Sequence, residues 1–181
     1  LGQLDNAITT AKQERNLANK HGFKQLEADA NRHIGTYAYY KGDSTLSLKS
    51  VKLSLDFYKT IDAPMPQADL YFNLAANYFQ MGLLEDALEY NDKAKVIYKE
   101  FGSISDNLYV DDNIYTIYIG LKKYNKAIKL ILESIDKRRE ISDEDGIASA
   151  YIELGSTYIT IGKYQKAFLA LNKAHDYYLK V

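Results

Sequence analysis

The chain contains no cysteine and no tryptophan, and only two prolines and two methionines among its 181 residues. The lack of cysteine excludes disulfides and thiolate metal sites within this segment, but it leaves the compartment open. The longest uninterrupted apolar runs are only a few residues, too short for a signal peptide or a membrane-spanning helix in this segment. Neither sign of charge dominates, since 23 basic and 24 acidic residues give a net charge of −1.

Basic residues gather at Lys137, Arg138 and Arg139, and acidic residues follow at 140 and 143–145. Binding to a phosphate backbone requires a stripe of positive charge that the rest of the chain does not provide. We interpret the cluster as the solvated last turn of a helix, where positive charge complements the helix dipole, with a phosphate site as the alternative. We therefore expect no nucleic-acid partner and no membrane contact for this segment.

The chain does have an internal repeat with a period of 40 residues. Gly2, Gly42, Gly82 and Gly162 recur at this spacing, and five residues after each stands an alanine or a serine. Such a period indicates a solenoid, in which each unit buries its apolar face against its neighbours. A binding surface is thus favoured over an active site.

Each copy of the repeat predicts two helices. In the fourth copy, Tyr151, Leu154 and Tyr158 recur at spacings of three and four residues, which is one face of an α-helix. A second stripe begins after a glycine turn and includes Ala167 and Leu171. Small residues on both stripes allow the two backbones to approach closely, and tyrosines fill the remaining space.

The order of aromatic, Leu-Gly, Tyr, Gly-x-Tyr-x-x-Ala, Leu and Ala between Tyr151 and Ala174 resembles the tetratricopeptide repeat, which is about 34 residues long. The copies here are longer, and their extra residues are expected between the units, at 21–26, 61–66, 101–106 and 141–146. Such long-period repeats are similar to those of bacterial regulators and sensors and of kinesin light chains. The resemblance implies an all-α solenoid, a right-handed superhelix of antiparallel helix pairs with about nine helices.

The array is expected to be continuous, because no linker is long enough to separate two domains. Prolines at 64 and 66 place one helix start near Pro66, and Gly22, Gly102 and Gly146 mark comparable breaks. The expected units are the second helix of a truncated repeat at 1–21 and complete repeats at 28–61, 68–101, 108–141 and 148–181.

The resemblance implies that the first helix of each pair lines the inner wall of the superhelix. Its sixth slot holds His33, Asn73, Asn113 and Glu153, and the two asparagines resemble a ladder that pairs with an extended peptide backbone. Exposed asparagines without a ligand are the alternative. The candidate binding residues of this wall are Arg32, His33, Thr36, Tyr39, Tyr40, Asp69, Phe72, Asn73, Asn77, Tyr109, Asp112, Asn113, Thr116, Ser149, Glu153 and Ser156.

Most of the 17 tyrosines fall into repeat columns, such as 58, 98 and 178, which predicts packing between helices. Tyr39, Tyr40 and Tyr109 lie outside these columns and are better candidates for contact with a ligand. The three histidines are scattered, and there is no cysteine nucleophile and no glycine-rich phosphate loop. We therefore expect no catalysis, no metal and no cofactor.

Two functions remain open. In the first, the segment binds a protein or peptide and is the sensory or partner-recognition part of a larger bacterial signalling or regulatory protein. Asp112 and Glu153 disfavour an acidic tail and favour a peptide with a basic or neutral centre. In the second, the segment is a structural adaptor that associates through its exposed terminal helices and has no peptide ligand.

Overall fold

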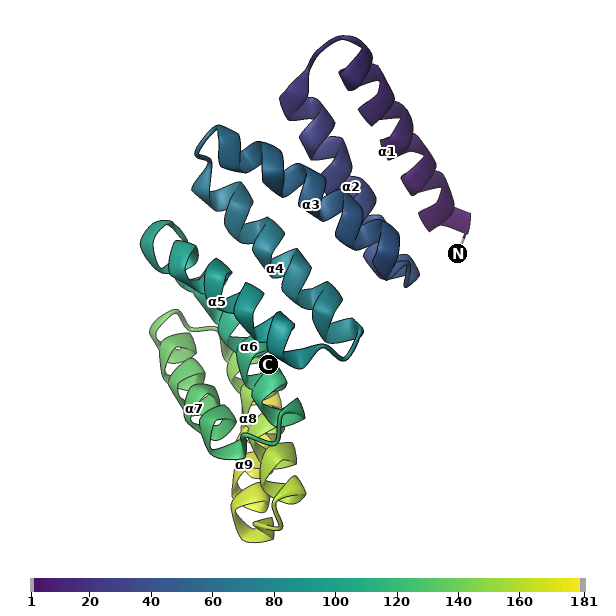
Figure 1. The fold of residues 1–181 in the computed structure, drawn as a ribbon. Helices are drawn as coiled ribbons and strands as arrows, with labels where there is room; N and C mark the ends of the chain where they lie inside the picture. Colours follow the sequence, from purple (N-terminus) through teal and green to yellow (C-terminus); the bar gives the residue numbers. More distant parts are fainter. Residues whose placement is uncertain (1, 180–181) are drawn as a thin grey trace. The chain divides into compact units, whose positions relative to one another are not determined.

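The computed structural model describes residues 2–179, and these form nine α-helices and no strand (Figure 1). None of the helices in this range is long and apolar enough to cross a membrane. The prediction of an all-α array of helix pairs is confirmed. The helices are α1 (Gly2–Lys20), α2 (Lys24–Lys41), α3 (Ser44–Thr60), α4 (Pro64–Gln80), α5 (Leu84–Phe101), α6 (Ile104–Gly120), α7 (Tyr124–Glu140), α8 (Glu144–Thr160) and α9 (Tyr164–Tyr178).

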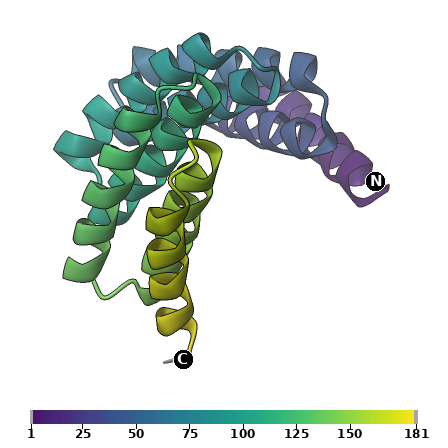
Figure 2. The ribbon, with the colours of Figure 1, turned by 90° about the horizontal axis from the view of Figure 1, so that it is seen from below.

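The chain divides into two compact units, Leu1–Gly102 and Ser103–Val181. In the first unit, each helix from α1 to α5 packs on the next one along the chain, and α2 also contacts α4 (Figure 1). In the second unit, α7 packs on α6, α8 packs on α7, and α9 packs on α8 (Figure 2). The first helices of the pairs are α2, α4, α6 and α8, and the others are the second helices.

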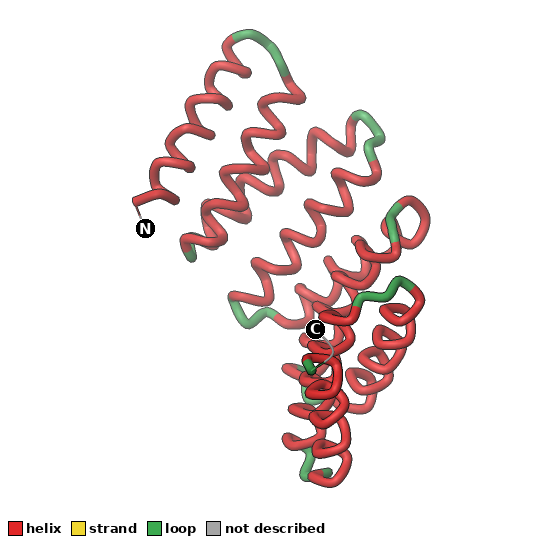
Figure 3. Tube along the Cα trace, turned by 180° about the vertical axis from the view of Figure 1, so that it is seen from behind, coloured by secondary structure: helices red, strands yellow, loops and turns green. Residues whose placement is uncertain are grey.

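Short turns join the helices (Figure 3), and most contain one residue with a positive φ angle. The conformation explains the recurring glycines, because a residue without a Cβ atom adopts it at little cost. One turn differs, since Gly102 has a φ of −89° and is followed by a capping box between Ser103 and Asp106. The residues with positive φ are Gly22, Gly42, Gly82 and Gly162, and also Asp62, Lys122 and Ser142.

The first helices start at residues 24, 64, 104 and 144, one turn before the expected repeat starts at 28, 68, 108 and 148. Pro64 is the first residue of α4, so the helix starts two residues before the expected Pro66. Asp143 caps α8 by accepting a hydrogen bond from the Gly146 amide, so the helix starts within the acidic run at 143–145. Gly146 therefore lies inside α8 and is not a break. Much of the extra repeat length forms additional helix.

Small residues bring paired helices together, as the repeat pattern predicts. A Cβ atom on Gly35 would lie 2.6 Å from Val51 Cγ2, and one on Gly155 would lie 2.7 Å from Leu171 Cγ. The Ser47 hydroxyl donates to the Gly35 carbonyl over 2.8 Å. The core cluster of the first unit consists of Ala28, Val51, Leu55, Tyr58, Leu70 and Leu74. Burial of each valine or leucine side chain in this cluster stabilises the unit by about 1.5–3 kcal/mol.

Candidate functional site

The sixth position of each repeat unit, counted from 28, 68, 108 and 148, is accessible to solvent. His33 is exposed, and Asn73, Asn113 and Glu153 are partly exposed. In the same helices Ile34, Leu74, Ile114 and Leu154, one position later, are buried. Because neighbouring residues of a helix point in different directions, one stripe of each first helix packs in the core and the residues before it form a polar row that solvent can reach. The row lies on α2 and α4 in the first unit and on α6 and α8 in the second.

In the first unit, the accessible stripe of α2 ends in two aromatic side chains. Tyr39 and Tyr40 pack edge to face with ring centroids 5.4 Å apart, and Tyr40 is 69% exposed. Both lie outside the tyrosine columns that pack between helices. An exposed aromatic pair can bury a large area against a partner at a small cost in side-chain entropy. The other predicted residues of this unit that are exposed or partly exposed are Arg32, Thr36, Asp69, Phe72 and Asn73.

Each first helix of this unit is tied to its own second helix by a tyrosine. The Tyr58 hydroxyl donates to Asp29 Oδ1 over 2.6 Å, and the Tyr98 hydroxyl donates to Asp69 Oδ1 over 2.5 Å. Burial and the hydrogen bond to the Asp29 carboxylate raise the pKa of Tyr58 to about 12. Asp69 is therefore already engaged by Tyr98, although part of its surface remains accessible.

Asn77 does not belong to the accessible stripe, contrary to the prediction. Its side chain is 1% exposed, and its amide donates to the Asn73 backbone carbonyl over 2.8 Å. The repeat contains a signal for this burial, because the residue 40 positions later is Ile117, which is also buried. A column that holds isoleucine in one copy faces the core in the others.

In the second unit, most predicted residues are free to contact a partner. Tyr109 is 65% exposed, and its column holds Asp29 and Asp69 in the first unit. Glu153 and Asn113 are partly exposed on neighbouring first helices of the same unit. The remaining exposed residues of this face are Thr116, Ser149 and Ser156.

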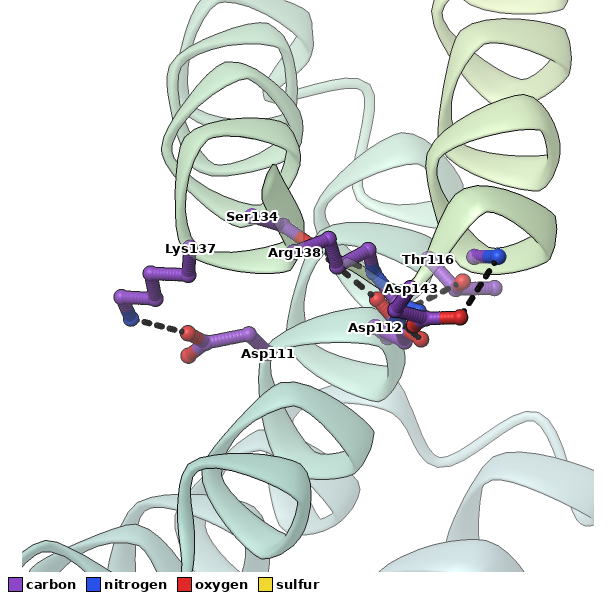
Figure 4. A network of polar contacts seen from close by, with 8 residues as sticks. Asp111, Asp112, Thr116, Ser134, Lys137, Arg138 and Asp143 are labelled. Carbon is purple, nitrogen blue, oxygen red and sulfur yellow. Dashed lines mark hydrogen bonds and ion pairs between the residues drawn. The ribbon is translucent and has the colours of Figure 1, made fainter. Parts of the chain in front are cut away.

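Asp112 is the exception, because Arg138 holds its carboxylate in an ion pair (Figure 4). The guanidinium also pairs with Asp143 Oδ2 over 2.6 Å and donates to Ser134 Oγ over 3.2 Å. Burial raises the pKa of Asp112 above its ordinary value, although Arg138 acts in the opposite direction. Burial and Asp112 together raise the pKa of the neighbouring Tyr115 phenol as well.

Arg138 is 8% exposed, so this member of the basic cluster is not solvated as the sequence predicted, whereas Arg139 is exposed. The cluster does form the last turn of α7, and Lys137 pairs there with the fully buried carboxylate of Asp111 over 2.8 Å. Sequence reasoning missed this network (Figure 4), although a signal existed. Arg138 occupies the column of Tyr58 and Tyr98, whose side chains are buried.

Comparisons with known proteins agree with the fold. Residues 107–180 match the family model described as tetratricopeptide repeat. The regulatory protein RapD of Bacillus subtilis (strain 168) is 29% identical over 140 residues, which are 77% of this chain and 40% of RapD. The chain therefore spans less than half the length of this relative.

Two solved structures share the fold. A Rap protein complexed with competence and sporulation factor matches with a TM-score of 0.75 and 17% identity, over 97% of this chain and 50% of the other. The STAND protein of Pyrococcus horikoshii, a signal transduction ATPase with a tetratricopeptide repeat sensor, matches with a TM-score of 0.80 and 23% identity. That match covers 95% of this chain and 27% of the other. At these identities the likeness concerns the fold alone.

Proposed function

We propose that this chain, whose residues 107–180 match the tetratricopeptide repeat, binds a protein or peptide segment through the accessible stripe of its first helices. One observation carries the proposal. The sixth slot holds an accessible polar side chain in all four complete copies, while the residue after it is buried. Accessible hydrogen-bonding groups that recur in one row are available to pair with a bound segment.

The chemistry of the row indicates an extended or neutral-to-basic segment. The Asn73 and Asn113 carboxamides each donate and accept, so they can pair with the backbone of a bound peptide whatever its side chains are. Glu153 adds a carboxylate to the row, and Tyr40 and Tyr109 add exposed aromatic surface. An acidic segment would meet the Glu153 carboxylate without a compensating cation on this stripe of α8.

The wider role that we propose is partner recognition within a larger bacterial signalling or regulatory protein. The name of RapD as a regulatory protein and the repeat sensor of the STAND protein support this role, as does the Rap protein solved with its factor. The chain matches only 40% of RapD, so any activity of a larger protein that contains this chain would also depend on other regions of that protein. The role assigned to these repeats is binding and includes no catalytic step.

The proposal can be tested with a library of fluorescently labelled peptides screened by anisotropy. We expect selective binders, and we expect Asn113→Ala with Glu153→Ala, both in the second unit, to weaken them about tenfold, because two hydrogen bonds to the peptide are lost. The matched control is Asn125→Ala with Asn172→Ala, which removes two exposed amides from second helices. A screen without a selective binder, or an equal effect of both double variants, would contradict the proposal.

The alternative is a structural adaptor whose terminal helices associate with other subunits. Exposed apolar side chains on α9 favour it, among them Phe168 and Leu169. Light scattering after size exclusion tests this role. A chain that stays monomeric at high concentration and still binds peptides would exclude the adaptor role and retain the peptide-binding function.

A further inference from the structure

A cavity of about 450 Å³ in the second unit is lined by the turn between α6 and α7 and by the turn between α8 and α9. The lining residues are Lys122, Lys123, Tyr124, Asn125, Lys126, Ile161 and Lys163. All four lysines are exposed, and no acidic side chain is among the lining residues. None of these lysines forms an ion pair with a carboxylate within residues 2–179. The cavity therefore gathers positive charge that the described part of the chain does not neutralise.

The repeat shows that the fold does not require these lysines. The position of Lys126 holds Asp86 in the second copy, and the position of Lys163 holds Asp43 in the first. Lys122 adopts a φ of 57°, whereas the other three copies hold glycine at this place in the turn. A residue with a Cβ atom is disfavoured in this conformation. The second unit thus carries lysines that its own turns do not favour.

Two of the lysines also stand where positive charge is unfavourable. Lys123 and Lys163 are the N-cap residues of α7 and α9, and neither helix has an acidic residue in its first turn. The start of a helix carries a partial positive charge from its unpaired amides, so a carboxylate is preferred there. The lysines repel these helix starts as well as one another. Negative charge bound in the cavity would relieve both repulsions.

We propose that this cavity binds an acidic segment of a partner protein. Tyr124 and Ile161 are partly exposed between the ammonium groups, so they can contact an apolar side chain that stands among the carboxylates. A nucleic acid would need positive charge beyond the cavity, but Lys137 and Arg138 of the same unit are already paired with aspartates. None of the lining residues belongs to the polar row, so this site is separate from the proposed function and each can fail alone.

The probe is the peptide Gly-Glu-Glu-Phe-Glu-Glu-Gly with an uncharged fluorophore, and its control has glutamine in place of every glutamate. Both are titrated with the 181-residue chain by anisotropy at low salt. We expect the acidic peptide to bind at least about tenfold more tightly, with a difference that shrinks as salt screens the charges. Equal binding of the two peptides, or no binding by either, would overturn the proposal. So would a single-stranded oligonucleotide that displaces the acidic peptide at a lower concentration, because the occupant would then be a nucleic acid.

Variants of the chain test the location. Lys122→Gln with Lys126→Gln should weaken binding of the acidic peptide about tenfold, because two of the attracting charges are lost. The matched control is Lys49→Gln with Lys99→Gln, which removes two exposed lysines from second helices of the first unit. Both double variants change the net charge equally. Equal weakening by the two would show attraction by net charge alone and would sink the site.

Lys126→Glu separates binding from stability. It places a carboxylate in the first turn of α7, where the helix dipole favours negative charge, so the urea midpoint should rise while binding of the acidic peptide is lost. Undiminished binding by this variant would place the peptide elsewhere on the chain. A lower urea midpoint would contradict the unfavourable charge from which the site is inferred.

Discussion

Tyr58 in the first unit and Arg138 in the second occupy the same column of the repeat, near the end of a second helix, and both are buried. Tyr58 makes one hydrogen bond to Asp29, within its own copy of the repeat. Arg138 is held by Asp112 of its own copy and by Asp143, the cap of the following helix α8. A neutral side chain fills this column with one partner, while a charged one requires two carboxylates.

The difference concerns how the cost of burial is met. A buried phenol keeps its proton and needs a single acceptor. A buried guanidinium is stable only when carboxylates surround it, and removal of one member leaves an uncompensated charge. The second unit should therefore be far more sensitive to single substitutions in this column than the first. Four predictions test that expectation, and a fifth compares two turns of the same two units.

The largest effect is expected for Arg138→Met, which keeps the aliphatic stem and removes the charge. Asp112 and Asp143 then lose their cation, and the free energy of unfolding should fall by about 3–5 kcal/mol. Urea unfolding followed by circular dichroism measures the change. The control is Arg139→Met, because Arg139 is exposed and the loss of its pairs should cost about 1 kcal/mol or less. Equal losses of unfolding free energy for the two variants would contradict the expected sensitivity of the column that Arg138 occupies.

A second substitution sharpens this test. Arg138→Tyr combined with Tyr109→Asp installs in the second unit the pair that Tyr58 and Asp29 form in the first. We expect the double variant to be more stable than Arg138→Tyr alone by about 1 kcal/mol, in the same urea experiment. If the effects of the two substitutions on the unfolding free energy simply add, the new tyrosine and aspartate do not form the hydrogen bond seen between Tyr58 and Asp29.

A smaller loss is expected for Gly146→Ala. The added methyl group would lie 1.9 Å from Arg138 Nη1 and 2.0 Å from Asp143 Oδ2, so the ion pair must shift. We expect destabilisation of about 2 kcal/mol. The cost should largely disappear in the Arg138→Met background, and a double-mutant cycle of urea midpoints measures this coupling. If Gly146→Ala lowers the unfolding free energy equally in both backgrounds, the loss comes from the helix backbone and not from the ion pair.

Tyr58→Phe should cost only about 1 kcal/mol near neutral pH. Its signature is the pH dependence. The pKa of Tyr58 is raised from 10.0 to about 12 in the folded state, so the folded chain keeps this proton more tightly than the unfolded chain does. The stabilisation is complete below pH 10 and is lost as the pH rises toward about 12. Unfolding free energies measured across this range should converge for wild type and variant, and parallel curves would refute the assignment.

The smallest effect compares two turns in one column. Gly82 has a φ of 76° in the first unit, and Lys122 adopts a φ of 57° in the second. Lys122→Gly relieves the cost of a left-handed residue with a Cβ atom, while the freer unfolded chain offsets part of the gain. We expect a net stabilisation of about 0.5 kcal/mol, and Gly82→Ala should destabilise by about 1 kcal/mol. Thermal unfolding measures both, and a destabilised Lys122→Gly would contradict the prediction.

The fold was predictable because its signals are local. Stripes at helical spacing, glycines in turns and small residues such as Gly155 depend only on neighbours in sequence and on the next helix. Helix starts were less predictable, because the residues of the extra length favour neither helix nor turn strongly. Asp143 caps α8 ahead of Gly146, which was expected to mark the break, and Pro64 begins α4 earlier than expected.

The site was predictable only in part. The accessibility of His33, Asn73, Asn113 and Glu153 follows from helical phase, which the sequence carries. The pairing of Arg138 with Asp112 does not, since the two are 26 residues apart and meet only because α6 and α7 pack side by side.

The contacts of Arg138 also bear on how such a chain gains or loses copies over evolution. Tyr58 and Asp29 lie within one copy, as do Tyr98 and Asp69, so recombination that moves a whole helix pair carries each of these bonds intact. Arg138 depends on Asp143 and on the small Gly146, which lie in the next copy. The third copy therefore keeps these contacts only when the first turn of α8 moves with it. The segment that preserves these contacts is therefore longer than one 40-residue period.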